Sequence, residues 1–170
     1  MKEFIDAFDY AGHICKAMKR GILLTTSDAG KVNTMTIGWG TLGIEWGKPI
    51  FVAYVRESRY TREFLDKTGE FTINIPLEEV NSAIISHCGK YSGRDHDKIA
   101  DLGLTLEQPV KISVPGIRQL PLTLECKVLF RNIQDERTLP EPLRSRYYPG
   151  EIADNHIAYY AEIVCAYKIT

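Results

Sequence analysis

The sequence has no long apolar run, no excess of one charge and no obvious export signal. Its formal net charge is −1 over 170 residues, which gives no basic surface for nucleic acid or anionic lipid. The longest apolar stretches, such as Ile50 to Val55, are far too short to cross a bilayer. Acidic residues stand near the N-terminus where a secretory signal would have its apolar core. We therefore expect a cytoplasmic protein with no nucleic-acid or membrane partner.

Paired cysteines are also lacking. The four cysteines are Cys15, Cys88, Cys126 and Cys165, and none belongs to a C-x-x-C motif. Because disulfides are rare in reducing compartments, we expect four free thiols, buried or half-buried.

Repeats, low-complexity tracts and linkers are missing as well, so residues 1–170 are predicted to form a single domain. Strands are predicted at Ile22–Thr26, Val32–Gly40, Ile50–Val55, Phe71–Ile75, Leu122–Val128 and Tyr159–Ile169. Helices are predicted over residues 3–19, from Arg59 to Lys67 with Gly69 as the residue that ends the helix, and as a turn at Asp97–Leu102. A further helix is predicted from Pro76 onward, with Glu79 in its first turn and Val80 on its apolar face. Loops are predicted at Gly43–Pro49, Gly89–Asp97 and Arg137–Gly150, the last with room for a short helix.

Two of these strands have informative patterns. Ile50–Val55 is apolar on both parities, as in a strand buried on both faces. Leu122–Val128 alternates, which predicts one wet face and one packed face. Strands outnumber helices and short turns join most of them. A mainly β (α+β) antiparallel barrel decorated with helices therefore fits better than a parallel α/β sheet.

The segment Arg56 to Thr61 has the features of an anion site. A buried strand ends there and a helix begins, with Ser58 as its expected N-cap. Free backbone N–H groups at a helix start attract anions, and Arg56 or Arg59 would supply a bidentate partner. A plain helix cap between solvated arginines is an equally good interpretation.

The segment Asn33 to Gly40 places small polar groups and backbone amides where they can meet the edge of a heteroaromatic ring. Trp39 could lie against such a ring, and Gly38 and Gly40 are typical of close approach by another group. The alternative is a hairpin strand with Trp39 in the core.

A third segment, His87 to Lys98, brings His, Cys and Asp close together in the sequence. Its spacing matches neither a zinc ribbon nor an H-E-x-x-H helix, so no metal is predicted. Neighbouring residues on a helix point about 100° apart, which disfavours a Cys88–His87 dyad. No nucleophile elbow, P-loop or dinucleotide fingerprint is present, and His156 is the histidine most worth testing.

Five motifs in order resemble the flavin reductase-like family, which includes flavoredoxins. They are Asn33-x-Met35-Thr36-x-x-Trp39-Gly40, Trp46-x-Lys48-Pro49, Val55-Arg56-x-Ser58-Arg59-Tyr60-Thr61, Phe71-x-x-Asn74-Ile75-Pro76 and Cys88-Gly89-x-x-Ser92-Gly93-Arg94-Asp95-x-Asp97-Lys98. The chain departs from many members at Lys19-Arg20-Gly21, where they have a proline-rich entry.

The resemblance implies an FMN-binding split β-barrel that works as a homodimer. It implies that the phosphate is bound by Arg56, Ser58, Tyr60 and Thr61. It also implies that the ring edge meets the strand residues Asn33, Thr34, Met35 and Thr36, with Trp39 and Lys98 lining the flavin too. The last strand and Tyr147-Tyr148 are candidate dimer contacts.

The expected function is that of a flavoprotein oxidoreductase, with electrons from NAD(P)H or a reduced protein donor passing to flavin or another acceptor. One alternative is a flavoredoxin-type electron carrier without NAD(P)H activity. Another is a non-catalytic module that binds flavin, haem or pyridoxal phosphate. No general acid or base is assigned, because the chemistry would be the cofactor's.

Overall fold

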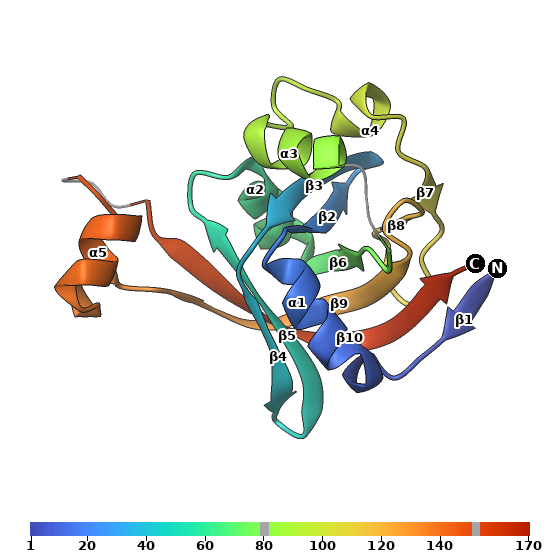
Figure 1. Cartoon of the computed structure of the whole chain (residues 1–170), viewed down its shortest axis with the longest axis horizontal. Coiled ribbons are helices and arrows are strands. Elements are labelled where there is room, and N and C mark those ends of the chain that lie inside the picture. The colour runs from blue at the N-terminus through green and yellow to red at the C-terminus, as the bar shows by residue number, and fades with distance from the viewer. Residues whose placement is uncertain (79–81, 151–153) are drawn as a thin grey trace.

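An antiparallel sheet of eight strands organises the computed structural model, which describes residues 1–78, 82–150 and 154–170 (Figure 1). The strand order is β3-β2-β6-β9-β10-β5-β4, and β1 pairs with β10. The strands are β1 Lys2–Phe4, β2 Ile22–Asp28, β3 Lys31–Ile37, β4 Gly40–Glu45, β5 Lys48–Arg56, β6 Glu70–Ile75, β9 Leu122–Ile133 and β10 His156–Ile169. A separate two-stranded ribbon joins β7 Leu106–Glu107 to β8 Gly116–Ile117.

The sheet curls but does not close, because β3 and β4 end the strand order without pairing with each other. A buried apolar cluster from β2, β3, β5, β6, β9 and β10 fills its concave side. The predicted antiparallel split barrel, mainly β with helices, is confirmed. One continuous sheet also supports the single-domain prediction, which stays a prediction.

Five α-helices in the described residues cover the sheet and its ends. They are α1 Ala11–Met18, α2 Tyr60–Thr68, α3 Ser82–Lys90, α4 Lys98–Asp101 and α5 Glu141–Tyr147, with 3-10 turns at Ala7–Tyr10 and Glu136–Thr138. None of these helices has the length and hydropathy needed to span a bilayer. Helix α2 ends at Gly69 as predicted, in a left-handed conformation with φ 63°.

The helix predicted over residues 3–19 is shorter than its pattern suggested. Its first residues form β1, and Asp6 then accepts the N–H of Phe8 to start the 3-10 turn. The pairing of β1 with β10 outcompetes helix formation at residues 2–4. The helix predicted from Pro76 is described only from Ser82, so Glu79 and Val80 lie outside the described residues.

The predicted loop Gly43–Pro49 is wrong. Residues there belong to a β4–β5 hairpin whose two turn residues, Trp46 and Gly47, have φ of 51° and 68°. Two positive φ values in a two-residue turn match the right-handed twist of paired strands. The two glycines of β4 make this segment look like a loop in the sequence, because glycine is uncommon in strands. The strand predicted to reach Gly40 accordingly ends at Ile37.

The predicted wet face of Leu122–Val128 is confirmed only at Lys127, which is exposed. Thr123 and Glu125 are fully buried, because residues 108–116 cover that face. The Glu125 carboxylate accepts the backbone N–H groups of Val110 and Lys111, each at 2.7 Å. A buried carboxylate with two such donors is satisfied without water. Ile50–Val55, by contrast, is buried on both faces as predicted, with only Tyr54 partly exposed.

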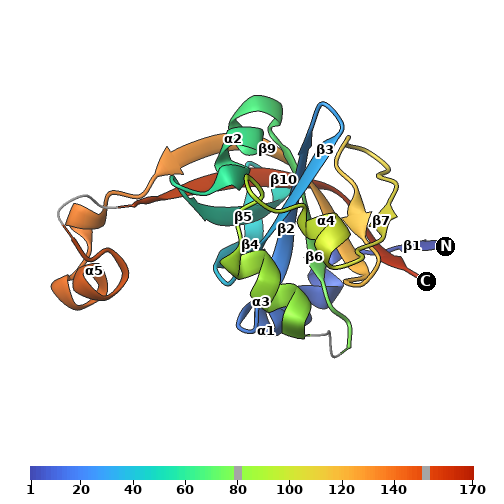
Figure 2. The same cartoon turned by 90° about the horizontal axis from the view of Figure 1, so that it is seen from above.

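Strand β9 continues beyond the body of the protein into a projecting arm, which we define as Leu129–Ile133 with helix α5 (Figures 1 and 2). Helix α5 confirms the short helix expected within Arg137–Gly150, and none of its residues is buried. All four cysteines are free. Cys88 and Cys126 are buried and Cys165 is half-buried, but Cys15 is exposed on α1, which corrects its prediction.

Candidate functional site

Two adjoining cavities lie where the sheet is split, between β3 and the C-terminal end of β5. The anion pocket has a volume of about 210 Å³, and the aromatic pocket has a volume of about 200 Å³. Met35, Arg56 and Arg59 line both. We define the anion pocket by these three residues together with Asn33, Ser58, Tyr60, Thr61, Tyr91, Arg94 and Lys98. We define the aromatic pocket by the same three residues together with Thr36, Trp39, Tyr54 and His156.

Three cations at the anion pocket donate hydrogen bonds to backbone carbonyls. Arg56 donates to the carbonyls of Asp154 at 2.8 Å and Tyr147 at 2.9 Å. Lys98 is 4% exposed and donates to the carbonyls of Cys88 and Tyr91, whereas Arg59 has one long bond, 3.4 Å, to the carbonyl of Gly89. None of the three cations forms an ion pair within the described residues. The pocket is therefore electrostatically prepared for an anion.

Burial sets the protonation of two groups beside these cations. It lowers the pKa of Lys98, and the nearby Arg59 lowers it further. Burial also raises the pKa of the Cys88 thiol to about 11. Cys88 is therefore a neutral thiol at pH 7, which argues against a nucleophilic role.

The donors of Ser58 face the carboxylate of Asp154. The Ser58 hydroxyl donates to Oδ2 at 2.6 Å, and its backbone N–H donates to Oδ1 at 3.0 Å. The N-cap of α2 is Arg59 and not Ser58, and the Arg59 side chain makes no capping hydrogen bond. Sequence reasoning missed Asp154, because no local pattern places a residue 96 positions away at this corner.

Asn33 contributes a buried polar atom with no partner. Its Nδ2 donates to the Thr61 hydroxyl at 2.8 Å, but its Oδ1 accepts no hydrogen bond within the described residues. Gly93 packs directly over it, since a Cβ there would lie 2.0 Å from Oδ1. Buried acceptors are normally satisfied, so this atom is a candidate for a ligand's donor.

Trp39 and His156, whose ring planes are tilted by 36° to each other, form a wall of the aromatic pocket. Trp39 is 40% exposed and lies 4.7 Å from the His156 ring and 5.2 Å from the Tyr147 ring, between centroids. His156 Nδ1 is 2.7 Å from the hydroxyl of Tyr148. Burial and the neighbouring Arg56 lower the pKa of His156 to about 4, so its imidazole is neutral at pH 7.

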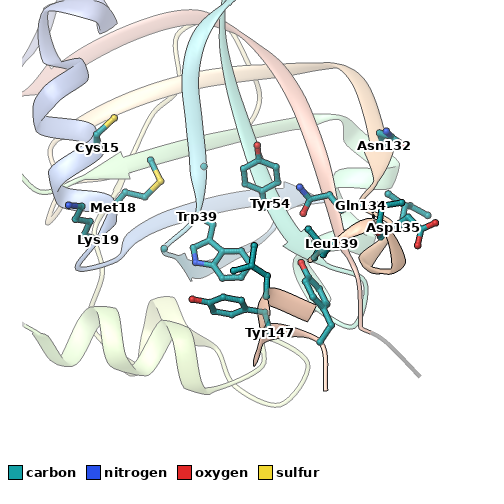
Figure 3. Close-up of a pocket in the computed structure, with 16 residues that line it drawn as sticks. Cys15, Met18, Lys19, Trp39, Tyr54, Asn132, Gln134, Asp135, Leu139 and Tyr147 are labelled. Carbon is teal, nitrogen blue, oxygen red and sulfur yellow. Dashed lines mark hydrogen bonds between the residues drawn. The ribbon is translucent and has the colours of Figure 1, made fainter. Parts of the chain in front are cut away.

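A larger groove of about 830 Å³ opens beyond Trp39 (Figure 3). It shares Gly38, Trp39 and Tyr54 with the aromatic pocket. Figure 3 shows Trp39 and Tyr147 side by side in it, with Met18 and Lys19 of the α1 end on one flank and residues of the β9–α5 segment on the other. Anion pocket, aromatic pocket and groove therefore form a continuous series.

The structure brings nine of the ten predicted site residues to the two pockets. They are Asn33, Met35, Thr36, Trp39, Arg56, Ser58, Tyr60, Thr61 and Lys98. The exception is Thr34, whose buried hydroxyl donates to the carbonyl of Leu24 at 3.2 Å. Thr34 lines a separate cavity that shares Asn33 and Lys98. That these residues contact a flavin stays a prediction.

We predict that His156 makes stability depend on pH. Its pKa of about 4 in the folded chain lies below its ordinary value of 6.5. As the pH falls from about 6.5 to about 4, the unfolded chain binds the proton more readily, and folding loses up to about 3 kcal/mol. Urea unfolding near pH 7 and near pH 4 measures the loss. His156→Gln keeps an acceptor for Tyr148 but does not titrate, so its loss should be smaller. Parallel profiles for the two proteins would contradict the assignment.

Comparisons with known proteins agree with this geometry. The profile described as a flavin reductase like domain matches residues 15–143. An uncharacterised protein of Archaeoglobus fulgidus is 30% identical over 106 residues, which are 62% of this chain and 59% of that protein. The aligned segment thus spans less than two thirds of this relative.

Solved structures share the fold at lower identity. The FMN-binding domain of a flavin reductases-like enzyme from Shewanella baltica has a TM-score of 0.66 at 19% identity, over 99% of this chain and 77% of that chain. Flavoredoxin of Desulfovibrio vulgaris (Miyazaki F) has a TM-score of 0.66 at 22% identity, over 88% and 69%. The matched profile covers well over half of the length of this chain. The chain therefore belongs to the flavin reductase-like family.

Proposed function

We propose that this chain is an FMN-binding oxidoreductase that takes electrons from NAD(P)H or a reduced protein donor and passes them to flavin or another acceptor. The observation that supports it best is the pair of adjoining pockets, one cationic and one aromatic, in the split of the barrel. FMN has the same two ends, a phosphate and a flat ring. The structural relatives from Shewanella and Desulfovibrio are an FMN-binding domain and a flavoredoxin.

The residues present fit FMN in chemical detail. Arg59 and Lys98 supply positive charge for the phosphate, and Ser58 supplies a hydroxyl and a backbone N–H. An incoming phosphate would replace the Asp154 carboxylate on Ser58. Asn33 Oδ1 needs a donor, and the ribityl hydroxyls of FMN are donors.

The protein's part in the reaction is binding and orientation. FMN, when bound, supplies the one- and two-electron chemistry. Trp39 and the neutral His156 offer flat faces for the ring, and the free edge of β3 offers backbone groups to its polar atoms. Lys98 belongs to the anion pocket and bonds two carbonyls, so its role lies with the phosphate. No general acid or base is assigned.

Two activities fit this site. The groove of about 830 Å³ beyond Trp39 leaves space for a donor such as NAD(P)H beside the ring, which favours a reductase. The likeness to flavoredoxin favours an electron carrier that exchanges electrons with partner proteins. Either kind of partner, NAD(P)H or a redox protein, would be met in the cytoplasm, and the cytoplasmic location stays a prediction from the sequence.

We predict that Arg59→Gln weakens FMN binding about 10- to 100-fold, because it removes one charge-assisted contact to the phosphate. Riboflavin, which lacks the phosphate, should bind equally well to both proteins. Arg62→Gln is the matched control, since Arg62 lies in the first turn of α2 and pairs with Asp66. Flavin fluorescence titration measures the dissociation constants. An unchanged FMN affinity, or an equal loss for riboflavin, would contradict this placement of the phosphate.

Arg59 is a cleaner target than Arg56 or Thr61, two of the phosphate-binding residues that the family resemblance implies. Arg56 fixes two backbone carbonyls and Thr61 accepts from Asn33, so their removal would also disturb the protein itself.

Anaerobic titration with NADH and NADPH separates the two activities. We expect bound FMN to bleach with one of the nucleotides, and the nucleotide to be oxidised steadily when free FMN is added. Bleaching by dithionite alone would support the carrier instead. A Soret band in the purified protein would indicate haem, and a protein that retains no flavin at micromolar concentration would refute the proposal.

A homodimer is the further part of this proposal. The arm exposes Leu129, Phe130, Ile133 and Leu143, each at 46–50%. Apolar side chains concentrated on one projecting segment are typical of an interface. The arm also forms one wall of the groove, so a second copy on it would close the site. The earlier candidates fit less well, since β10 lies between β9 and β5 and Tyr148 is 7% exposed.

We expect light scattering to give twice the chain mass of 19.3 kDa. Ile133→Glu should give monomers that bind FMN less tightly, because a charge on the arm opposes burial. Leu106→Glu, at a residue 36% exposed on β7, is the matched control and should remain dimeric. A monomeric unaltered protein would refute the dimer and leave the flavin proposal standing.

A further inference from the structure

Three side chains with metal-ligating atoms meet outside the anion pocket and the aromatic pocket. His87 comes from α3, His96 from the loop that follows, and Asp101 from the last residue of α4. His87 Nε2 and His96 Nδ1 each lie 3.4 Å from the same oxygen, Asp101 Oδ2. All three atoms lie within 4.8 Å of one another.

We propose that His87, His96 and Asp101 bind a divalent first-row transition ion such as Zn²⁺, with water as the fourth ligand. Tetrahedral zinc with bonds of about 2.0–2.1 Å holds its ligand atoms about 3.3–3.4 Å apart. Both histidine-to-carboxylate separations have that value. Two imidazoles and one carboxylate suit Zn²⁺ better than Mg²⁺ or Ca²⁺, which prefer oxygen alone.

The surrounding chain holds the ligands in place before a metal arrives. The Tyr91 ring contacts both imidazoles, with its centroid 4.5 Å from that of His87 and 4.6 Å from that of His96. The backbone N–H of His96 donates to the Ser92 carbonyl at 3.1 Å, and the backbone N–H of Asp101 donates to the Asp97 carbonyl at 2.8 Å. A site fixed by packing loses less entropy on binding than one on free side chains.

This cluster differs from any that the sequence suggested. Spacing alone predicted no metal, since the ligands are nine and five residues apart and match no common motif. The cluster omits Cys88, which is buried. His96 belongs to the loop that contributes Tyr91 and Arg94 to the anion pocket, yet none of the three ligand side chains lines that pocket. The ion would therefore brace that loop without touching a flavin.

Zn²⁺ titration of tag-free, chelator-treated protein tests the site. We expect one ion per chain, and visible absorption typical of four-coordinate Co²⁺ when Co²⁺ replaces it. His87→Ala and His96→Ala should each weaken binding at least about tenfold, and the conservative Asp101→Asn should weaken it as well. His13→Ala is the matched control, because His13 bonds the Pro76 carbonyl away from the cluster, and it should bind as the unaltered protein does.

Circular dichroism and melting without metal show whether each variant is folded, and Asp101→Asn remains informative should a histidine variant unfold. Zn²⁺ should raise the melting temperature of the unaltered protein and not that of His87→Ala/His96→Ala. No bound Zn²⁺, or equal affinity in this double variant, would overturn the proposal and leave two histidine–aspartate contacts. Flavin-free protein is used throughout, so the result does not depend on the flavin proposal.

Discussion

The positive charge gathered beside the end of β5 is the constraint on which the site depends. Arg56, Arg59 and Lys98 gather there, and in the described part of the chain their hydrogen bonds go to backbone carbonyls only. Carbonyl dipoles satisfy the donors but leave the net charge in place. Gathering like charges costs free energy that an anionic ligand recovers on binding. The arrangement is therefore better suited to binding than to stability.

The open sheet provides the place for this charge. In a closed barrel, β3 would pair with a neighbour and its edge would be used up by backbone hydrogen bonds. Here β3 ends the strand order, and the chain crosses at Gly38 and Trp39 to begin β4 on the far side. Gly40 permits that crossing, because a Cβ there would lie 2.8 Å from the Phe51 ring and 3.1 Å from the Val52 carbonyl. The same geometry leaves the two pockets between β3 and β5.

Local sequence patterns reached the antiparallel fold class, whereas the family resemblance supplied the full set of site residues, nine of which line the two pockets. The strand Ile50–Val55 and the Gly69 cap are examples in which local chemistry decides. Prediction from the sequence failed where a segment far away in the chain changes the environment of a residue. Glu125 looks solvent-facing until residues 108–116 cover it, and Ser58 looks like a helix cap until Asp154 takes its hydroxyl. The histidine–aspartate cluster likewise exists only because α3 and α4 meet.

The Arg56 side chain links the arm to the anion pocket. The Arg56 guanidinium binds the carbonyl of Tyr147, at the end of α5, and that of Asp154, just before β10. Asp154 in turn offers its carboxylate to Ser58. An anion that replaces this carboxylate would release one of the bonds that hold the segment before β10, while Arg56 retains the others. Arg56 and Asp154 therefore connect the anion pocket to the end of the arm through a short chain of hydrogen bonds.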